Sequence, residues 1–311
     1  MKDYVPQLAS LVKTPPSGDE WLHEIKLDGY RIGCLIAGDR IRLISRNGQD
    51  WTSVFPEIVE AARTLAVKDA IVDGEIVMLQ PDGRTSFEAL QQAISGRGLR
   101  ARLVYFAFDL LRLEGERIDR LPLEARKARL LKLLGRRKTG RIRYTEHIDG
   151  RGSAFFDEAC RLGLEGIVSK RRDLPYQPGR RDSWRKTKCV RRGLFVVGGF
   201  TDPEGSRVGL GALVVGRYDA SRLVFAGRVG TGFSHSVAID LRQKLESTAQ
   251  RDCPFDPRPA GPLGRNAHWV TPTLVCEVTF TEWTEAGVLR HPSFQGVRAG
   301  VKPTDVALGG K

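Results

Sequence analysis

The character of the sequence changes near residue 190, and this change restricts the folds that the chain can adopt. Beyond that point, short β-type runs alternate with glycine-rich turns, as in LFVVGGF, GALVVGRYD, RLVFAGRVG and LVCEVTFTEW. One segment with helical spacing, residues 235–248, interrupts these runs. About five short strands with one inserted helix predict a small β-barrel, for which the OB-fold is the natural candidate. We therefore predict a boundary near residues 188–193 and an OB-fold domain over residues 190–311.

The first part of the chain, residues 1–189, mixes strand patterns with helix patterns. Three segments show helical spacing, and Pro56 suits the first turn of one of them. Alternating or continuous apolar runs indicate strands, and Asp73 followed by Gly74 predicts a turn within one of these strands. These patterns predict an α+β domain of antiparallel sheets with flanking helices. The predicted helices are 54–65, 121–134 and 152–163, and the predicted strands lie within 21–48, 69–79, 102–113 and 164–171.

Lysine and arginine outnumber aspartate and glutamate by 50 to 37, which gives a formal net charge of +13. This excess favours a polyanionic partner such as nucleic acid, and a basic protein without a specific partner is the alternative. No apolar run reaches the roughly 20 residues of a membrane helix, and no signal peptide is evident, so we expect a cytoplasmic protein. The five scattered cysteines argue against a disulfide scaffold and against structural zinc. An oxygen-ligated magnesium site stays open.

The stretch EIKLDGYR, residues 24–31, places Lys26 between two apolar neighbours and just before a glycine. A lysine becomes nucleophilic when burial or nearby cations lower its pKa and free the amine lone pair. Asp28 could orient the amine or a cation, and Arg31 could fork a sugar or a phosphate. Without this context, a surface lysine is the simpler interpretation.

The same stretch resembles the K-x-D-G-x-R signature of the covalent nucleotidyltransferases, which comprise DNA ligases, RNA ligases and mRNA capping enzymes. Further elements of that superfamily follow in order along nearly the whole chain. Their details are most similar to ATP-dependent DNA ligases, and within these to the ligase module of bacterial ligase D. The matching elements are SRNG (45–48), DGEIV (73–77), FDLL (108–111), EGIVSK (165–170), WRKTK (184–188) and RHPSFQGVR (290–298).

The resemblance implies an adenylation (nucleotidyltransferase) domain over residues 1–189, followed by the OB-fold domain. It implies three chemical steps: a lysine takes AMP from ATP, the AMP passes to the 5′-phosphate of a nick, and the 3′-hydroxyl displaces it. Mg²⁺ is the implied metal, with Mn²⁺ as an alternative. Nicked duplex DNA is the implied substrate, in DNA repair and end joining, with Ku or polymerase and phosphoesterase modules as candidate partners. We expect a nucleoid-associated monomer and a minimal core that grips DNA with two domains alone, either free-standing or part of a larger polypeptide.

The resemblance also assigns roles to single residues. Lys26 is the implied nucleophile, with Asp28, Lys186 and Lys188 as further catalytic residues, and the two lysines share one face of a strand. Several other residues have a simpler structural alternative. These are a turn carboxylate for Glu75, a core aromatic for Phe108, a solvated strand-end glutamate for Glu165, a basic surface strand for Lys186 and Lys188, and a surface arginine for Arg46. The expected nucleotide contacts are Glu24, Arg31, Glu75, Phe108, Arg290 and Arg298. The expected metal ligands are Glu165 and Glu75, and the expected DNA contacts are Arg46, Arg191, Arg192, Arg207, Arg217 and Arg228.

The sixth element departs from the family pattern R-x-D-K. Arg298 is followed by Ala299, Gly300 and Val301, so the aspartate is absent and Lys302 comes one position late. We therefore predict slow self-adenylation. Two alternatives stay open: an RNA ligase or capping guanylyltransferase of the same superfamily, and a nucleic-acid-binding scaffold without catalytic activity. Only the scaffold is favoured by the altered sixth element.

Overall fold

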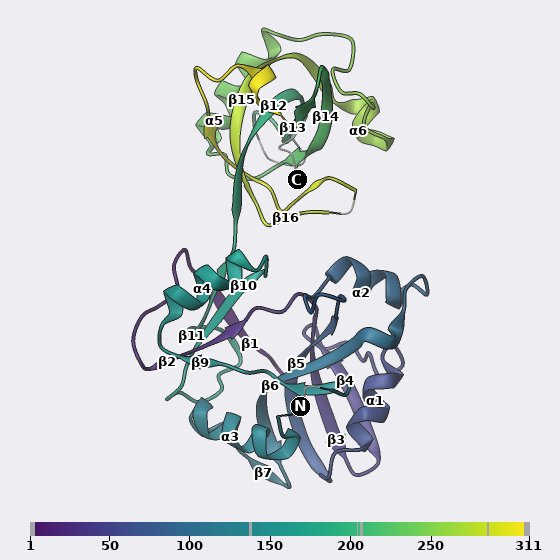
Figure 1. Cartoon of the computed structure of the whole chain (residues 1–311), viewed down its shortest axis with the longest axis vertical. Helices are drawn as coiled ribbons and strands as arrows, with labels where there is room; N and C mark the ends of the chain where they lie inside the picture. The colour runs from purple at the N-terminus through teal and green to yellow at the C-terminus, as the bar shows by residue number, and fades with distance from the viewer. Residues whose placement is uncertain (1–3, 137–138, 204, 206–207, 285, 308–311) are drawn as a thin grey trace. The chain divides into compact units, whose positions relative to one another are not determined.

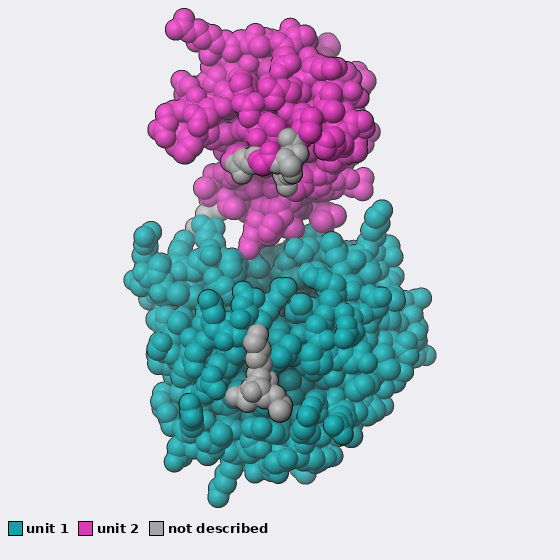
Figure 2. Space-filling model, turned by 180° about the vertical axis from the view of Figure 1, so that it is seen from behind, with its two compact units in different colours: residues 1–189 teal, residues 190–311 magenta. Residues whose placement is uncertain are grey.

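The computed structural model describes the chain except residues 1–3, 137–138, 204, 206–207, 285 and 308–311 (Figure 1). It divides into two compact units, residues 1–189 and 190–311 (Figure 2). Each unit has its own hydrophobic clusters, for example around Ile32 and Leu130 in the first unit and around Phe195 and Leu241 in the second.

The first unit contains a mainly antiparallel sheet with helices packed on it. Its strand order is β4-β3-β5-β6-β7, and β8 pairs in parallel with β6. Side chains of α1, α2 and α3 share one buried cluster with this sheet, which is how the amphipathic helices hold their places. The strands are β3 (Tyr30–Ala37), β4 (Arg40–Ser45), β5 (Asp69–Met78), β6 (Leu103–Leu113), β7 (Glu116–Arg117) and β8 (Ile142–Tyr144). The helices are α1 (Pro56–Arg63), α2 (Phe87–Ile94) and α3 (Leu123–Leu134), and a short 3₁₀ turn spans Arg100–Arg102.

A second sheet completes the first unit. Three of its strands, β2, β10 and β11, lie next to or contain the predicted site residues Lys26, Glu165, Lys186 and Lys188. Its order is β1-β11-β10-β2-β9, with β1 parallel to β11 and the other pairs antiparallel. The helix α4 contacts β10 and β2. The bounds are β1 (Gln7–Leu11), β2 (Trp21–Ile25), β9 (Ile148–Asp149), α4 (Gly152–Arg161), β10 (Gly166–Arg171) and β11 (Gly179–Lys188).

The second unit is built on a five-stranded antiparallel sheet of order β14-β13-β12-β15-β18. Among the residues that the structure describes, no ladder joins β14 to β18, so the predicted barrel is not closed by strand pairing. The helix α5 packs its buried side chains into the same cluster as the sheet. The elements are β12 (Arg191–Thr201), β13 (Ala212–Asp219), β14 (Arg222–Val229), α5 (His235–Glu246), α6 (Gly261–Asn266), β15 (His268–Phe280), β16 (Glu282–Trp283), β17 (Leu289–Arg290), β18 (Ser293–Val297) and a 3₁₀ turn at Pro303–Asp305.

Most sequence-based element predictions are confirmed. The four helices expected at 54–65, 121–134, 152–163 and 235–248 are α1, α3, α4 and α5, and Pro56 is the first residue of α1. One prediction is wrong: Asp73 and Gly74 do not form a turn but lie inside the continuous strand β5. The helix α2 was not predicted, although Ser86 caps it by accepting a hydrogen bond from the Ala89 amide at 3.1 Å.

The cysteines also differ from expectation. Cys160, in the last turn of α4, forms a disulfide with Cys189, the last residue of the first unit. No local pattern predicts this pair, because 29 positions separate the two residues and neither lies in a recognisable cysteine motif. Of the helices described, none is both long and apolar enough to cross a membrane.

Candidate functional site

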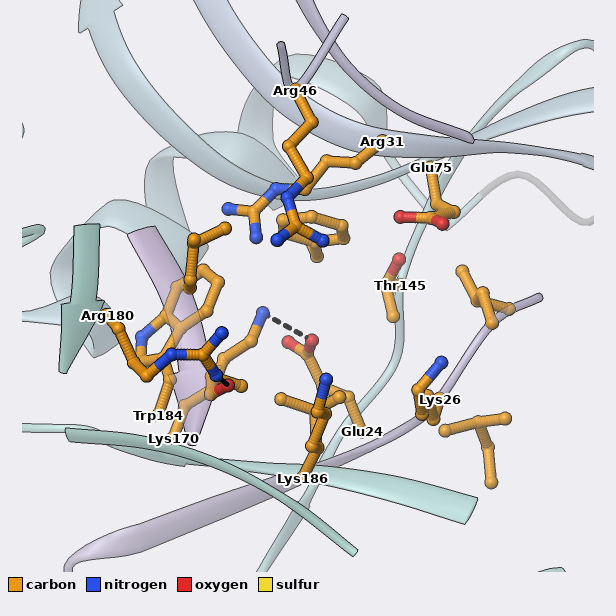
Figure 3. A pocket seen from close by; sticks show the side chains of 16 residues that line it. Glu24, Lys26, Arg31, Arg46, Glu75, Thr145, Lys170, Arg180, Trp184 and Lys186 are labelled. Atoms are coloured by element: carbon orange, nitrogen blue, oxygen red, sulfur yellow. Dashed lines mark hydrogen bonds and ion pairs between the residues drawn. The ribbon is translucent and has the colours of Figure 1, made fainter. Parts of the chain in front are cut away.

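A pocket in the first unit gathers most of the predicted site residues. It is lined by side chains from both sheets of that unit, so strands far apart in sequence meet around it (Figure 3). Its polar lining is mostly cationic, and its apolar lining includes two aromatic rings. The lining residues are Leu8, Ala9, Glu24, Ile25, Lys26, Leu27, Arg31, Arg46, Glu75, Phe108, Thr145, Val168, Lys170, Arg180, Trp184 and Lys186.

Lys26 directly follows β2, and two contacts fix its position. Its backbone amide donates a hydrogen bond to the Gly166 carbonyl at 2.9 Å. Its Nζ lies 2.5 Å from Oε2 of Glu165, and both side chains are about four-fifths buried. Oε1 of the same glutamate lies 3.5 Å from Nζ of Lys188. The structure thus brings together three residues that the sequence placed in one site, with Glu165 between two lysines.

The strand β11 supplies cations to the same pocket. Lys186 and Arg180 both line it, because alternate residues of a strand point to one side. Burial lowers the pKa of Lys186, and the charges of Lys26, Lys188, Arg180 and Arg46 lower it further. A cluster of this kind attracts phosphate groups, because the cations outnumber the one carboxylate, Glu165, that pairs with Lys26 and Lys188.

Glu24 lies in β2 at the floor of the pocket, where it is almost completely buried. Its Oε1 lies 2.5 Å from Nζ of Lys127 and its Oε2 lies 2.6 Å from Nζ of Lys170. Burial raises the pKa of Glu24, but the two lysines more than offset this and hold it below its usual value. The carboxylate is therefore ionised and can only accept hydrogen bonds.

Arg31 lines the pocket but is already paired. Its Nε and Nη2 donate to the two oxygens of Asp73 at 3.0 and 2.6 Å, and Asp73 also accepts from the hydroxyls of Tyr4 and Tyr176. The fully buried Asp73 therefore anchors the arginine rather than shaping a turn. In this arrangement the guanidinium fork is occupied by a carboxylate, whereas the sequence predicted a sugar or phosphate partner.

The aromatic side of the pocket is formed by Phe108 and Trp184, whose rings are 6.0 Å apart and nearly perpendicular. Nζ of Lys170 lies 4.2 Å from the Phe108 centroid and 4.1 Å from that of Trp184. Burial lowers the pKa of Lys170.

Glu75 lies on another wall of the pocket and is half-buried. Burial raises its pKa to about 7, against the opposing effect of Lys26 and Arg31.

Some predicted site residues lie elsewhere. Asp28 is not among the lining residues, and its backbone amide donates to Thr85 at 3.3 Å. Arg290 and Arg298 belong to the second unit, where each pairs with a glutamate, Glu282 at 2.5 Å and Glu277 at 2.6 Å respectively. Slow self-adenylation caused by the altered sequence after Arg298 stays a prediction.

The predicted DNA-contacting arginines of the second unit fall into three groups. Arg191 and Arg192 in β12 and Arg228 in β14 are exposed. Arg217 is partly buried instead: its guanidinium lies 4.4 Å from the Phe195 centroid, its Nε donates to the Leu194 carbonyl, and burial lowers its pKa. Arg207 lies outside the described residues.

Sequence reasoning missed several residues of the pocket. Lys170 ends the EGIVSK element and alternates with Val168 along β10, a signal that would have placed both on the pocket side. Arg180 could have been found by the same alternation along β11. Thr145 and the buried Lys127 carry no local signal, because only the folded chain brings them to Glu24.

Two family models match the chain. Residues 6–188 match the "ATP dependent DNA ligase domain", and residues 206–300 match the "ATP dependent DNA ligase C terminal region". The chain is 40% identical over 297 residues to the multifunctional non-homologous end joining protein LigD of Pseudomonas aeruginosa, covering 94% of this chain and 35% of that protein. It is 38% identical over 292 residues to LigD of Mycobacterium tuberculosis, covering 92% and 37%. The chain thus spans about a third of the length of these relatives.

Solved structures give the same result. The ligase domain of M. tuberculosis LigD superimposes with a TM-score of 0.56 at 32% identity, covering 99% of each chain. A mycobacterial DNA ligase D complexed with ATP and MES superimposes with a TM-score of 0.56 at 32% identity, covering 98% of each chain.

Proposed function

Because this chain belongs to the ATP-dependent DNA ligase family, we propose that it seals 5′-phosphate/3′-hydroxyl nicks in duplex DNA through an AMP group carried on Lys26. The resemblance seen in the sequence is confirmed, and so are the fold class and ATP as the nucleotide. The comparisons favour a DNA ligase over an RNA ligase, a capping enzyme or a scaffold without activity. The observation that carries the proposal is Lys26 within 2.5 Å of Glu165, in a pocket lined by further cations.

In the first step, Nζ of Lys26 attacks the α-phosphorus of ATP. A phosphorus–nitrogen bond forms, the bond to the β-phosphate oxygen breaks, pyrophosphate leaves and the amine loses a proton to water. Glu165 pairs with the lysine in the absence of nucleotide, so this pair must open before the attack. Lys186 and Lys188 lie close enough to stabilise the charge that develops on the phosphate oxygens.

The later steps use the same pocket. AMP passes from Lys26 to the 5′-phosphate at the nick, and the 3′-hydroxyl then attacks that phosphate and releases AMP. Arg46 lines the pocket and is the candidate contact for the 5′-phosphate, and Phe108 is the candidate stacking partner for adenine. Glu24 presents ionised oxygens that suit the exocyclic amine of adenine and not the O6 acceptor of guanine.

Glu75 and Glu165 are the residues that would hold Mg²⁺, with Mn²⁺ as an alternative. They fit such an ion, because Mg²⁺ is usually held by one or two carboxylates together with substrate phosphates. The charge of Glu165 contributes to the raised pKa of Glu75, so a bound cation would offset the repulsion between the two carboxyls. Within the described residues no group of three or more metal-ligating side chains occurs. When bound, the ion neutralises phosphate charge during phosphoryl transfer.

We further propose a role in the repair of broken DNA by end joining, because the relatives are named for that process. Ku and separate polymerase or phosphoesterase modules are candidate partners, and the chain is proposed to act as a monomer. The exposed arginines of the second unit would hold the phosphates of the duplex.

Intact-protein mass spectrometry after incubation with ATP and Mg²⁺ tests the proposal. We expect the wild type to gain one AMP and the Lys26→Ala variant to gain none. Any AMP already bound is first removed with pyrophosphate and nicked DNA. If the treated wild type takes up no AMP from ATP, the proposal is overturned, and uptake of GMP from GTP would instead indicate a capping enzyme. Sealing of a nick with RNA strands in preference to DNA would indicate an RNA ligase.

A further inference from the structure

The disulfide between Cys160 and Cys189 lies where the two units join. Cys160 is in the last turn of α4, and Cys189 is the last residue of the first unit. Both cysteines are half-buried, so small thiols can approach them. By contrast, Cys34 and Cys276 are buried, and burial raises the pKa of each thiol to about 12, which makes them poor partners for exchange.

The disulfide joins the two ends of a segment, residues 160–189, that includes Glu165 in the connection between α4 and β10. The Gly163 amide donates to the Cys160 carbonyl at 3.0 Å, and the Cys189 amide donates to the Glu165 carbonyl at 3.0 Å. Glu165 in turn contacts Nζ of Lys26 at 2.5 Å and Nζ of Lys188 at 3.5 Å. One covalent bond thus links the helix before Glu165 to the residue directly after the lysine-bearing strand β11.

We propose that Cys160 and Cys189 form a reversible thiol–disulfide switch that slows the transfer of AMP to Lys26 when oxidised. This inference rests on the proposed function. The oxidant is a low-molecular-weight disulfide: the two thiols lose two protons and two electrons to it, one protein disulfide forms, and two small thiols are released. A disulfide of this kind exchanges readily with small thiols when its sulfurs are accessible.

The direction of the effect follows from the contacts of Glu165. In the oxidised state, the disulfide holds the connection between α4 and β10 at its α4 end, the Cys189 amide holds it at its β10 end, and Glu165 is kept on Nζ of Lys26. Nζ can reach the α-phosphorus only after this pair opens. Reduction frees the α4 end at Cys160 and lets Glu165 move away at lower cost.

The test compares the full chain in two redox states, which requires no substitution. One sample is equilibrated with oxidised glutathione and the other with dithiothreitol, and excess reagent is removed. Intact mass after thiol labelling gives the state of the pair. Formation of the Lys26–AMP adduct is then followed over time at saturating ATP. We expect the oxidised sample to react about tenfold more slowly, in the range typical of coupling between two sites.

Variants separate this pair from other thiols. Cys160→Ser and Cys189→Ser should each react at the rate of the reduced wild type in both samples. Cys253→Ser, which changes another half-buried cysteine, should keep the full response to oxidation. Equal rates for oxidised and reduced wild type, or failure of the pair to oxidise, would overturn the switch alone. If even the reduced wild type acquired no AMP, the proposed function would fall and the switch with it.

Discussion

Glu75 is a carboxyl group whose burial raises its pKa to about 7. In the unfolded chain it would lose its proton near its usual value of 4.5, so the folded state binds more protons between these two pH values. The stability contributed by this group is therefore greatest at low pH and is lost as the pH rises from about 4.5 to about 7. We expect the unfolding free energy of the wild type to fall, relative to Glu75→Gln, by about 2 kcal/mol between pH 5 and pH 8.

Urea denaturation of both proteins at the two pH values measures this difference. Glu60→Gln is the matched control, because Glu60 is an exposed carboxylate on α1, and it should keep the pH dependence of the wild type. A constant difference between wild type and Glu75→Gln across this pH range would contradict the assignment.

The site shows which residues can be predicted from the sequence alone. The motifs predict Lys26, Glu165, Lys186 and Lys188 as site residues, and the fold brings them together, while their chemical roles stay predictions. Their partners were not found. The pairing of Glu24 with Lys127 joins residues 103 positions apart, and no local pattern encodes a contact of that range.

The helix α3 connects the two sheets of the first unit through two consecutive cations. Arg126 is fully buried and donates to both oxygens of Asp109 in β6, at 2.8 Å each. Lys127 reaches Glu24 in β2, which belongs to the other sheet. The amphipathic pattern predicted this helix correctly, but it carries no sign that Arg126 and Lys127 are buried.

Replacing Lys127 with methionine keeps the length of the side chain and removes its charge. Glu24 then stays buried with only Lys170 as a partner, and we expect the unfolding free energy to fall by about 3 kcal/mol. Lys132→Met is the control, because Lys132 is exposed on the same helix, and it should change stability by less than about 0.5 kcal/mol. Chemical denaturation measures the unfolding free energy of both variants. An equal decrease in the two would show that the buried Glu24–Lys127 pair contributes no more to stability than an exposed lysine.

The strands that the sequence predicted lie at the expected positions along the chain, but the turn expected within β5 is absent. The Asp73–Gly74 pair has the composition of a turn, yet β5 runs through it because Arg31, Tyr4 and Tyr176 satisfy the buried carboxylate. These partners come from three other segments, so local propensity gave way to long-range contacts. The helix α2 shows the opposite case, because its local sequence does favour the structure. Ser86 caps this helix, although its apolar pattern is short.

The two units have separate hydrophobic clusters, which predicts separate unfolding events. Calorimetry of the intact chain should show two transitions. An ATP analogue with a methylene group between its α- and β-phosphates cannot transfer AMP and should raise only the transition of residues 1–189. At 100 times the dissociation constant the stabilisation is about 2.7 kcal/mol. A single transition, or an equal shift of both, would contradict this independence.

The net charge of +13 predicts that DNA binding weakens steeply with salt. If Arg191 and Arg192 each contact a phosphate, replacing both with alanine should lower the slope of log affinity against log salt by about 2. Arg222→Ala is the control, because this exposed arginine already pairs with Asp219. Gel-shift titrations over a range of salt concentrations give the slopes, and an unchanged slope in the double variant would exclude both contacts.

Gly166 lies beside Lys26, the proposed nucleophile, yet it has no side chain that could take part in the reaction. Its carbonyl accepts the Lys26 amide, its φ is +140°, and a Cβ there would lie 2.1 Å from the Thr187 carbonyl oxygen. Any side chain would force β10 and β11 apart just where Glu165 and Lys188 meet. In evolutionary terms, this position is closed: descendants of the chain can vary the side chains around the pocket, but a lineage that replaces this glycine loses the strand pairing that holds Lys26 beside Glu165.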